Sequence, residues 1–404
     1  MNLPAFDRYG SPLYVFHEPD FRANYSHFLH SMRSEYEKYT PAYSFKTNYT
    51  PYICGLIREM GGYAEVVSLM EYKLARKIGF EPAEIIYNGP DKKSEIYEAL
   101  SDGSIINADS YGEVLRICEY AQADPGHHYE FGLRVNLDLG QDFVSRFGMD
   151  EQDIERSFEY VKSIPNAEIV GLHCHISRCR GIEAWEKRTR IMLGLADRFF
   201  DHPLKYIDLG SGMFGVMDDE LAAQFDDIPS YDDYASVTCR LVNEHYRDYD
   251  ISDRPVLFTE PGTTLINKYI SLVSHVDEIK TVRGRTFAVL DCSEHNLGEI
   301  CTLKKVPVEV IAAPDHPTDR PLLKDVDLVG YTCLEQDVMY TGCNGPLAVG
   351  DTVVFHNVGG YSNVLKPPFI RPGCAMITLR DDGSILEIKR AETDDDVMST
   401  YVFE

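Results

Sequence analysis

Residue types that can take part in covalent, acid–base or anion-binding chemistry stand at the ends of short apolar runs in this sequence. Each run stops at a polar residue or a glycine, and the eight residues are Lys46, Glu65, Asn88, Asp109, Arg134, His175, Gly210 and Glu260. A lysine amine is a nucleophile, carboxyl and imidazole groups exchange protons, and glycine lets a backbone approach a ligand closely. If these runs are parallel strands of a barrel, their carboxyl ends converge on one face.

The elements that must position these residues repeat along the first two-thirds of the chain. Amphipathic stretches with helical spacing separate most of the runs, for example Pro51–Met60 and Glu71–Gly79. Strand and helix alternating eight times predict an α/β fold with a (β/α)8, TIM-like barrel. A doubly wound sheet is the alternative, but no GxGxxG follows the first run. The eight predicted strands are Ala42–Lys46, Tyr63–Val67, Ile85–Asn88, Ser104–Asp109, Tyr129–Asn136, Ile169–His175, Tyr206–Gly210 and Val256–Glu260.

The pattern changes after Gly262, which predicts a second, all-β domain at the C-terminal end. The runs there alternate or are β-branched, and turn residues separate them. The early segment Pro12–Phe16 is also strand-like and is expected to pair with this second domain. We therefore expect a barrel domain over residues 24–262 and a β domain formed by residues 1–23 and 263–404. The predicted β runs are Lys268–Val276, Thr286–Leu290, Val306–Ile311, Asp351–Phe355 and Ala375–Leu379.

Composition narrows the classes of function. The 404 residues carry a formal net charge of −26, which opposes binding to nucleic acid or to an anionic membrane surface. No run of about 18 apolar residues occurs, and the start of the chain lacks a secretory signal, so a cytoplasmic location is expected. The ten cysteines form no CxxC pair. His173 and His175 have no acidic or cysteine partner at ligand spacing, so no metal is expected.

The segment Tyr43–Asn48 resembles the lysine motif of the fold-type III, alanine-racemase-like decarboxylases that depend on pyridoxal phosphate. This group includes diaminopimelate, ornithine and arginine decarboxylases. The resemblance covers nearly the whole chain, and it implies a pyridoxal 5'-phosphate cofactor, a small amino-acid substrate and a homodimer with shared active sites. The further matching segments, in order, are Glu65–Ser68 with Glu71, Asn88–Pro90 with Lys92 or Lys93, Gly171–His175, Asp208–Gly212, Glu260–Gly262, Gly330–Cys333 with Asp337, Gly350-Asp351 and Gly359–Tyr361.

The resemblance implies a role for four side chains around the cofactor ring. Lys46 would hold the cofactor as a Schiff base, and Glu65 stands near that imine where an aspartate is usual. Glu260 would face the pyridine nitrogen and favour its protonated form. His175 would stack on the ring. A lysine snorkelling at the barrel rim, a helix-capping glutamate and a structural histidine are the respective alternatives.

A second set of residues would bind the cofactor phosphate. Gly210, Ser211 and Gly212 fit a loop that brings backbone N–H groups close to an anion, and Tyr361 would add a hydroxyl from the β domain. A Gly-Ser-Gly sequence is by itself often only a tight turn. The phosphate role therefore depends on the resemblance.

Cys333 would come from the other subunit and assist protonation of the carbanion, as the cysteine of the resembling enzymes does. A buried structural cysteine is the alternative. Glu335 and Asp337, which follow it, are candidate substrate-binding residues together with Arg178. We expect Arg178 to contact a second acidic group on the substrate, although a solvated loop charge would explain it as well.

Three departures separate this chain from the pattern that it resembles. Ser177 and Arg178 replace the usual Gly and Ser after the histidine motif, Thr263 replaces an arginine after Glu-Pro-Gly, and Leu334 replaces an acid after the cysteine. The neutral Leu334 argues against recognition of a distal ammonium group at that place. The substrate therefore does not follow from the resemblance.

The function expected from the sequence is removal of the α-carboxylate of an amino acid, or of an amino-acid conjugate, through the Lys46 Schiff base. Two alternatives remain, which are an amino-acid racemase of the same fold type and a catalytically silent regulatory relative. Racemases carry an arginine at the pyridine nitrogen, and Glu260 disagrees with that pattern. Retention of Lys46, Cys333 and Tyr361 argues against a silent protein.

Overall fold

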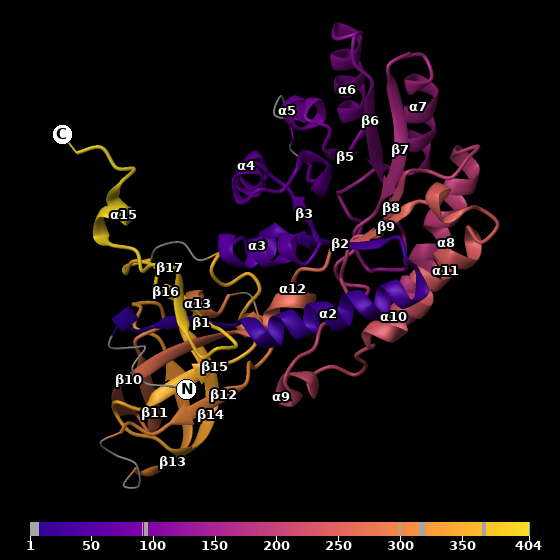
Figure 1. The fold of residues 1–404 in the computed structure, drawn as a ribbon. Coiled ribbons are helices and arrows are strands. Elements are labelled where there is room, and N and C mark those ends of the chain that lie inside the picture. Colours follow the sequence, from indigo (N-terminus) through magenta and orange to yellow (C-terminus); the bar gives the residue numbers. More distant parts are fainter. Residues whose placement is uncertain are drawn as a thin grey trace. The chain divides into compact units, whose positions relative to one another are not determined.

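A computed structural model describes residues 8–90, 92, 96–298, 300–314, 320–365 and 369–403 (Figure 1). The chain divides into two compact units. The first comprises Tyr25–Gly215 and Asp227–Thr264, and the second comprises Met1–Asn24, Val216–Asp226 and Leu265–Glu404. In the described part of the chain, no helix has both the length and the apolar character needed to cross a bilayer.

The first unit contains a closed barrel of eight parallel strands, which confirms the predicted fold class. Every predicted run overlaps one of the strands. Lys46 itself lies just outside its strand, in the 3₁₀ turn Phe45–Thr47, so its side chain starts beyond the strand end. The barrel strands are β2 (Tyr39–Ser44), β3 (Tyr63–Val66), β4 (Ile85–Tyr87), β5 (Ile105–Ala108), β6 (Tyr129–Arg134), β7 (Ala167–His173), β8 (Tyr206–Asp208) and β9 (Val256–Thr259).

Helices follow the strands and surround the barrel (Figure 1). Two of them begin directly after a strand because a serine caps the first turn: the hydroxyl of Ser68 accepts the N–H of Glu71 at 3.2 Å, and that of Ser110 accepts the N–H of Glu113 at 3.3 Å. These caps fix where each strand end turns away from the barrel. The helices are α2 (Glu18–Glu35, shared with the second unit), α3 (Pro51–Glu59), α4 (Leu69–Ile78), α5 (Ile96–Ser101), α6 (Tyr111–Ala123), α7 (Glu151–Val161), α8 (Ile182–Phe199), α10 (Tyr231–Val237) and α11 (Cys239–His245).

Tyr206 fills the interior of the barrel, where two glycines make room for its side chain. A Cβ atom at Gly171 would overlap the Tyr206 ring, and one at Gly132 would overlap the Tyr206 hydroxyl. That hydroxyl donates to the Asn107 side-chain oxygen at 2.8 Å. The ring packs in the core cluster that includes Ala42 and Phe258. A polar group is therefore buried in the barrel interior with a partner, as burial requires.

The second unit is built on a mostly antiparallel sheet in which strands run in the order β14-β13-β11-β10-β1-β16-β17, with β15 joining β10 to β12. The early strand β1 (Leu13–His17) pairs with both β10 and β16, as the sequence predicted for Pro12–Phe16. The other strands are β10 (Ile270–Val282), β11 (Arg285–Leu290), β12 (Val308–Ile311), β13 (Leu322–Val329), β14 (Val338–Pro346), β15 (Thr352–Phe355), β16 (Ala375–Leu379) and β17 (Ile385–Lys389). Short helices accompany them, namely α9 (Asp219–Ala222), α13 (Glu294–Leu297), α14 (Ile300–Leu303) and α15 (Asp394–Met398), and α12 (Thr263–Ile266) spans the boundary between the units.

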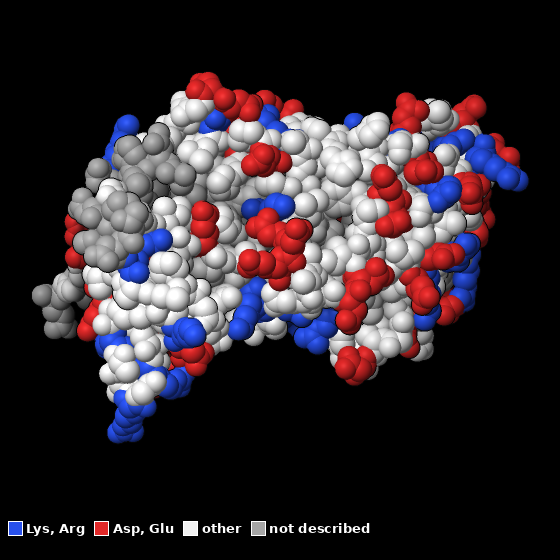
Figure 2. Space-filling model, turned by 90° about the horizontal axis from the view of Figure 1, so that it is seen from below, with Lys and Arg blue, Asp and Glu red and all other residues white. Residues whose placement is uncertain are grey.

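The charge imbalance of the sequence is visible on the surface. Figure 2 shows acidic side chains in several groups over one face of the molecule, with basic side chains scattered between them. This distribution agrees with the formal charge of −26. It favours small-molecule chemistry over binding to polyanions.

Candidate active site

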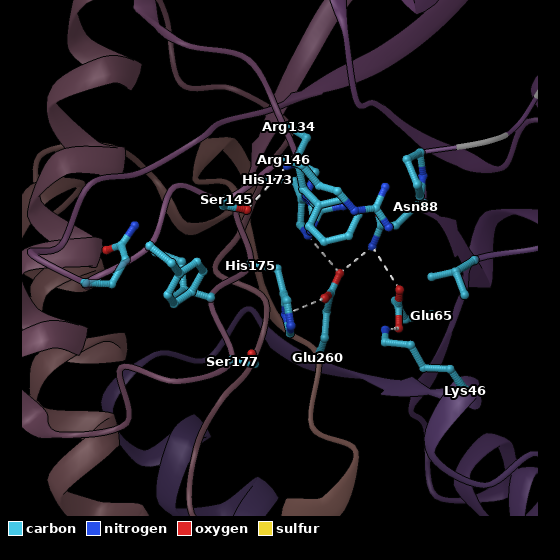
Figure 3. A pocket seen from close by; sticks show the side chains of 17 residues that line it. Lys46, Glu65, Asn88, Arg134, Ser145, Arg146, His173, His175, Ser177 and Glu260 are labelled. Carbon is cyan, nitrogen blue, oxygen red and sulfur yellow. Dashed lines mark hydrogen bonds and ion pairs between the residues drawn. The ribbon is translucent and has the colours of Figure 1, made fainter. Parts of the chain in front are cut away.

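A cavity of about 330 Å³ lies where the barrel strands end (Figure 3). Its size is within the range of small-molecule sites. Residues of six strand ends line it together with the segment that follows β6. The charged and polar lining residues are Lys46, Glu65, Asn88, Arg134, Gln141, Ser145, Arg146, His173, His175, Ser177 and Glu260.

Lys46 and Glu65 form a contact pair at one side of the cavity. The Lys46 ammonium nitrogen lies 2.5 Å from a carboxylate oxygen of Glu65, and the Ser44 hydroxyl donates to that same oxygen at 2.7 Å. The Glu65 side chain is buried, whereas that of Lys46 is 30% exposed. Lys46 is therefore oriented by a fixed carboxylate and still reaches the open part of the cavity.

Glu260 lies at the centre of the cavity and receives contacts from three sides. The Asn88 amide donates to its Oε1 atom, the His173 Nε2 atom lies 3.0 Å from the same oxygen, and the His175 Nδ1 atom lies 3.4 Å from Oε2 (Figure 3). Burial opposes ionisation of this carboxyl, but the two imidazoles and Lys46 outweigh it and hold the pKa of Glu260 well below its usual range. A buried carboxylate is thus available to a cationic group in the cavity.

Asp208 is a second buried carboxyl group close to Glu260. Its Oδ1 atom accepts the N–H of Gly210 at 2.8 Å, whereas Oδ2 has no partner. Burial, with the nearby charge of Glu260 next in importance, raises the pKa of Asp208 well above its usual range. The pKa values of these two neighbouring acids are therefore shifted in opposite directions, Glu260 toward the ionised form and Asp208 toward the neutral form.

The orientation of the Asn88 amide is set by a chain of hydrogen bonds through the barrel. The Asn88 side-chain oxygen accepts from the Asn107 amide at 2.9 Å, and Asn107 in turn accepts from the Tyr206 hydroxyl. The Asn88 nitrogen must then face the cavity, where it donates to Glu65 at 3.3 Å and also to Glu260. Glu65 and Glu260 therefore share the Asn88 amide as a hydrogen-bond donor.

His175 and the glycine loop after β8 are joined through the backbone. The N–H of Ser211 lies 3.2 Å from His175 Nδ1, the ring nitrogen that also faces Glu260 Oε2 at 3.4 Å. Burial lowers the pKa of His175, which favours the neutral ring. Gly210 and Gly212 have φ values of 62° and 105°, and a Cβ atom on either would overlap the carbonyl oxygen of Cys174 or Ile176. Only glycine fits these two positions.

These observations fit pyridoxal phosphate. Lys46 could offer an amine to the aldehyde, Glu260 could offer a negative charge to the ring nitrogen, and the Gly210–Gly212 loop is a tight backbone turn of the kind that approaches phosphate. His175 sits between Glu260 and that loop, since its Nδ1 atom contacts both. The donor set is that of an aldehyde cofactor with an anionic group, which matches the sequence expectation.

The end of β6 and the segment after it supply cavity residues that were not among the site residues predicted from the sequence. Arg134 is buried, pairs with Asp109 at 3.0 Å and faces the ring of Phe147, while Arg146 also stacks on Phe147 at 4.2 Å. Arg146 and Phe147 line the cavity. The sequence did mark Arg134 as a possible site residue, because it lies near the end of a predicted strand. Arg146 lies in an irregular segment, where neither periodicity nor strand position marks it.

Arg178 lies at the rim of the cavity. The residue is exposed, and its guanidinium carbon is 5.3 Å from the centre of the Phe143 ring, which is itself a lining residue. Among the described residues that line the cavity, Ser177 is present and Arg178 is absent. The arginine therefore lies next to a lining residue without lining the cavity itself.

The expectation that His173 has no acidic partner is wrong, because two residues distant in the sequence lie next to it in the fold. Closure of the barrel brings Asp208 and Glu260 against it, and their ligand-type atoms all lie within 4.8 Å of one another. Sequence spacing failed here because the three residues come from the ends of β7, β8 and β9. The Asn88 amide, which donates to Glu65, also donates to Glu260 of this group.

Lys92, which the sequence matched as an alternative to Lys93, is buried away from the cavity lining. It donates to the Glu113 carboxylate at 2.7 Å and to the Gly89 carbonyl at 2.6 Å. Because Glu113 also accepts the N–H of Asp109, this pair ties the ends of β4 and β5 together. Lys93 lies outside the described residues.

The remaining predicted site residues belong to the second unit. Asp337 is buried and accepts hydrogen bonds from the Thr332 hydroxyl at 2.6 Å, the Thr332 N–H and the N–H of Glu294. This arrangement holds the turn on which Cys333 and Glu335 are both exposed. Tyr361 adopts a left-handed backbone conformation, with φ of 57°.

A family comparison matches the barrel unit. The sequence model of the family described as "Pyridoxal-dependent decarboxylase, pyridoxal binding domain" matches residues 22–267, more than half of the chain. The chain belongs to the pyridoxal-dependent decarboxylases. This decarboxylase therefore uses pyridoxal 5'-phosphate as its cofactor and acts on an amino acid, and the comparisons do not favour the racemase alternative.

Relatives of this decarboxylase cover almost its whole length. Diaminopimelate decarboxylase from Methanothermobacter thermautotrophicus is 26% identical over 97% of this chain and 92% of the relative, and that from Aquifex aeolicus is 26% identical over 96% and 90%. The fold is shared with the crystal structure of diaminopimelate decarboxylase from M. jannaschi (TM-score 0.84, 21% identity, 100% and 94% coverage). It is also shared with the Helicobacter pylori enzyme complexed with L-lysine (TM-score 0.82, 22% identity, 98% of each chain).

Proposed function

We propose that Lys46 is the residue that binds the cofactor covalently and that the chain removes the α-carboxylate of an amino acid or an amino-acid conjugate at this lysine. The observation that carries the proposal is the placement of the Lys46 amine, which is 2.5 Å from a buried carboxylate and 30% exposed in the cavity. When bound, pyridoxal phosphate supplies the electron sink that accepts the electron pair left by departing carbon dioxide.

The chain's own groups have separate tasks in this proposal. Glu65 and Ser44 hold the Lys46 nitrogen in place, and the Asn88 amide keeps Glu65 and Glu260 a fixed distance apart. Glu260, ionised in its buried position, keeps a proton on the nitrogen of the cofactor ring. These groups are preorganised, so they need not reorganise during the reaction.

His175, the glycine loop and Tyr361 would complete the cofactor site. The neutral ring of His175 offers a flat face for stacking, and its Nδ1 atom is already fixed by the Ser211 N–H. The Gly210–Gly212 loop would bind the cofactor phosphate, with the N–H of Gly212 as its donor because those of Gly210 and Ser211 already donate to Asp208 and His175, and Tyr361 would add a hydroxyl. Support for the loop comes from its two glycines, where any side chain would collide with the neighbouring loop.

The proposal includes a two-fold symmetric dimer in which residues 24–262 bind the cofactor and residues 1–23 and 263–404 complete the partner's site. Cys333 would then donate a proton to the carbanion after carbon dioxide has left. The exposed position of Cys333, on a turn that Asp337 holds in place, supports a contact outside its own unit. The resemblance around Cys333 supplies the assignment to the other subunit.

The substrate is proposed to differ from diaminopimelate at its far end. The relatives named above act on diaminopimelate, but Leu334 offers no charge to a distal ammonium group. Arg178 at the rim, with Glu335 as a second candidate, would contact the far end instead. An acidic or conjugated side chain fits an arginine better than an ammonium does.

Two measurements test the proposal. Borohydride reduction of the purified holoenzyme, followed by peptide mapping, should leave a pyridoxyl group on Lys46, and a label on another lysine would overturn the assignment. A mass-spectrometric screen of L-, D- and conjugated amino acids should detect loss of one carbon dioxide from a substrate. Lys46→Ala should abolish this turnover, with the exposed Lys187→Ala as the matched control.

A further inference from the structure

Arg188 of α8 is fully buried and joins two loops of the cavity. One amino group of its guanidinium donates to the carbonyl oxygens of Leu209 at 3.0 Å and of Ser211 at 2.9 Å, and the other donates to that of Ile176 at 2.9 Å. Leu209 and Ser211 belong to the loop after β8, and Ile176 belongs to the loop after β7. Arg188 therefore links, through hydrogen bonds to their carbonyl groups, the loop of Gly210 and Gly212 and the loop that follows His175.

The charge of Arg188 has no acidic partner at contact distance. Within the described part of the chain, no carboxylate lies within 4.0 Å of its guanidinium, which instead packs on the Trp185 ring with its carbon 4.0 Å from the ring centre. Burial lowers the pKa of Arg188, but a guanidinium is so basic that it remains protonated at neutral pH. A cation is thus held behind the loop, where carbonyl groups, an aromatic face and the more distant charge of Glu260 offset its cost of burial.

The three hydrogen bonds also determine where backbone N–H groups point. In a planar trans peptide the C=O and the following N–H point in opposite directions. Since the carbonyls of Ser211 and Ile176 face Arg188, the N–H groups of Gly212 and Ser177 face away from it. Arg188 lies on one side of these peptide units, and the N–H groups point to the other.

We propose that Arg188 is the cation of the phosphate subsite and that it acts through the backbone of the two loops without touching the phosphate. This inference rests on the proposed function, in which the Gly210–Gly212 loop binds the phosphate. Polarised by a buried positive charge, the peptide units become better donors to an anion. The Gly210–Gly212 loop carries no cationic side chain of its own, so a charge held behind it can act on the phosphate through the backbone.

A purely structural link would behave differently. If Arg188 had only a structural role, its replacement would lower the stability of the fold and weaken the binding of every ligand in the cavity to the same extent. A cation that serves the phosphate would act selectively on ligands that carry the phosphate. The ratio of two dissociation constants, that of pyridoxal divided by that of pyridoxal 5'-phosphate, separates these effects because both compounds carry the aldehyde that meets Lys46.

The experiment measures this ratio by absorbance titration of the full-length apoenzyme. Arg188→Gln keeps hydrogen-bond donors but removes the charge, and the ratio should fall about ten-fold or more. Arg188→Lys keeps the charge and should stay within about three-fold of the wild-type ratio. Arg190→Gln on the same helix is the matched control, because Arg190 is exposed and pairs with Glu186, and its ratio should equal that of the wild type.

The outcomes are distinguishable. An unchanged ratio in Arg188→Gln, with wild type still preferring the phosphorylated compound, overturns the role of Arg188 and leaves the proposed function intact. A wild-type ratio near one overturns the phosphate loop itself. If Arg188→Gln does not fold, Arg188→Met, which also removes the charge, takes its place: a ten-fold fall in its ratio supports the role of the charge, and an unchanged ratio overturns it.

Discussion

Asp208 and Glu260 end neighbouring strands of the barrel as two buried carboxyl groups that titrate in opposite directions. Burial raises the pKa of Asp208, while the pKa of Glu260 is held low in spite of burial. The neighbours make the difference, since His173, His175 and Lys46 lower the pKa of Glu260, whereas the charge of Glu260 adds to burial in raising that of Asp208. The pair keeps one negative charge in a volume that would be destabilised by two.

We expect Asp208→Asn to gain stability over the wild type as the pH rises. The folded wild type keeps a proton on Asp208 that the unfolded chain loses above the ordinary carboxyl pKa, so its stability falls with pH by up to about 1.4 kcal/mol per pH unit. Asparagine cannot ionise and escapes this loss. Urea unfolding of both apoenzymes between pH 5 and 8 gives the slope. The exposed Asp201→Asn is the control, and a flat difference for Asp208→Asn would contradict the neutral acid.

Glu260→Gln should lower turnover by about two to four orders of magnitude, since it removes the charge that keeps the ring nitrogen protonated. The glutamine amide still reaches its neighbours, so the fold should survive. Steady-state turnover and the absorption spectrum of the bound cofactor are the measurements. The variant should retain cofactor, and activity within a few-fold of wild type would show that the enzyme does not depend on this carboxylate.

Mixing Lys46→Ala chains with Cys333→Ala chains should restore activity, because a mixed dimer holds one site with both residues intact. At equal amounts about a quarter of the wild-type activity is expected. Exchange of chains must be shown by native mass spectrometry of the mixture. Two inactive variants that exchange subunits and stay inactive would argue for a site contained in one chain.

Arg178→Ala should lower kcat/KM by about one to two powers of ten while cofactor affinity stays unchanged, as expected for a contact to the substrate's far end. Arg156→Ala is the matched control, because Arg156 is exposed and also packs on an aromatic ring, that of Tyr111. Weaker cofactor retention in Arg178→Ala would instead indicate a phosphate contact. No change in either quantity would leave Arg178 as a solvated charge.

The sequence predicted the barrel because each buried strand is an apolar run that stops at a polar residue or a glycine. It missed β13, β14 and β17, since most of their residues are only partly buried or exposed and polar residues interrupt their apolar residues. Lys46 and Glu260 were recognisable from local motifs. Arg188 was not, because its partners are carbonyl oxygens of distant loops, and backbone groups leave no trace in residue identity.

Tyr206 has a consequence for how homologous chains can vary. Its ring requires glycine at positions 132 and 171, and its hydroxyl decides through Asn107 which way the Asn88 amide faces. Replacing Tyr206 in the barrel interior is thus expected to disturb the active site, as replacing an active-site residue would. Natural variation should therefore exchange these positions as one block. A smaller side chain at 206 would make room for a side chain at position 171 on β7, and at position 132 on β6 if Asn107 changed with it, and the orientation of the Asn88 amide would then need another partner.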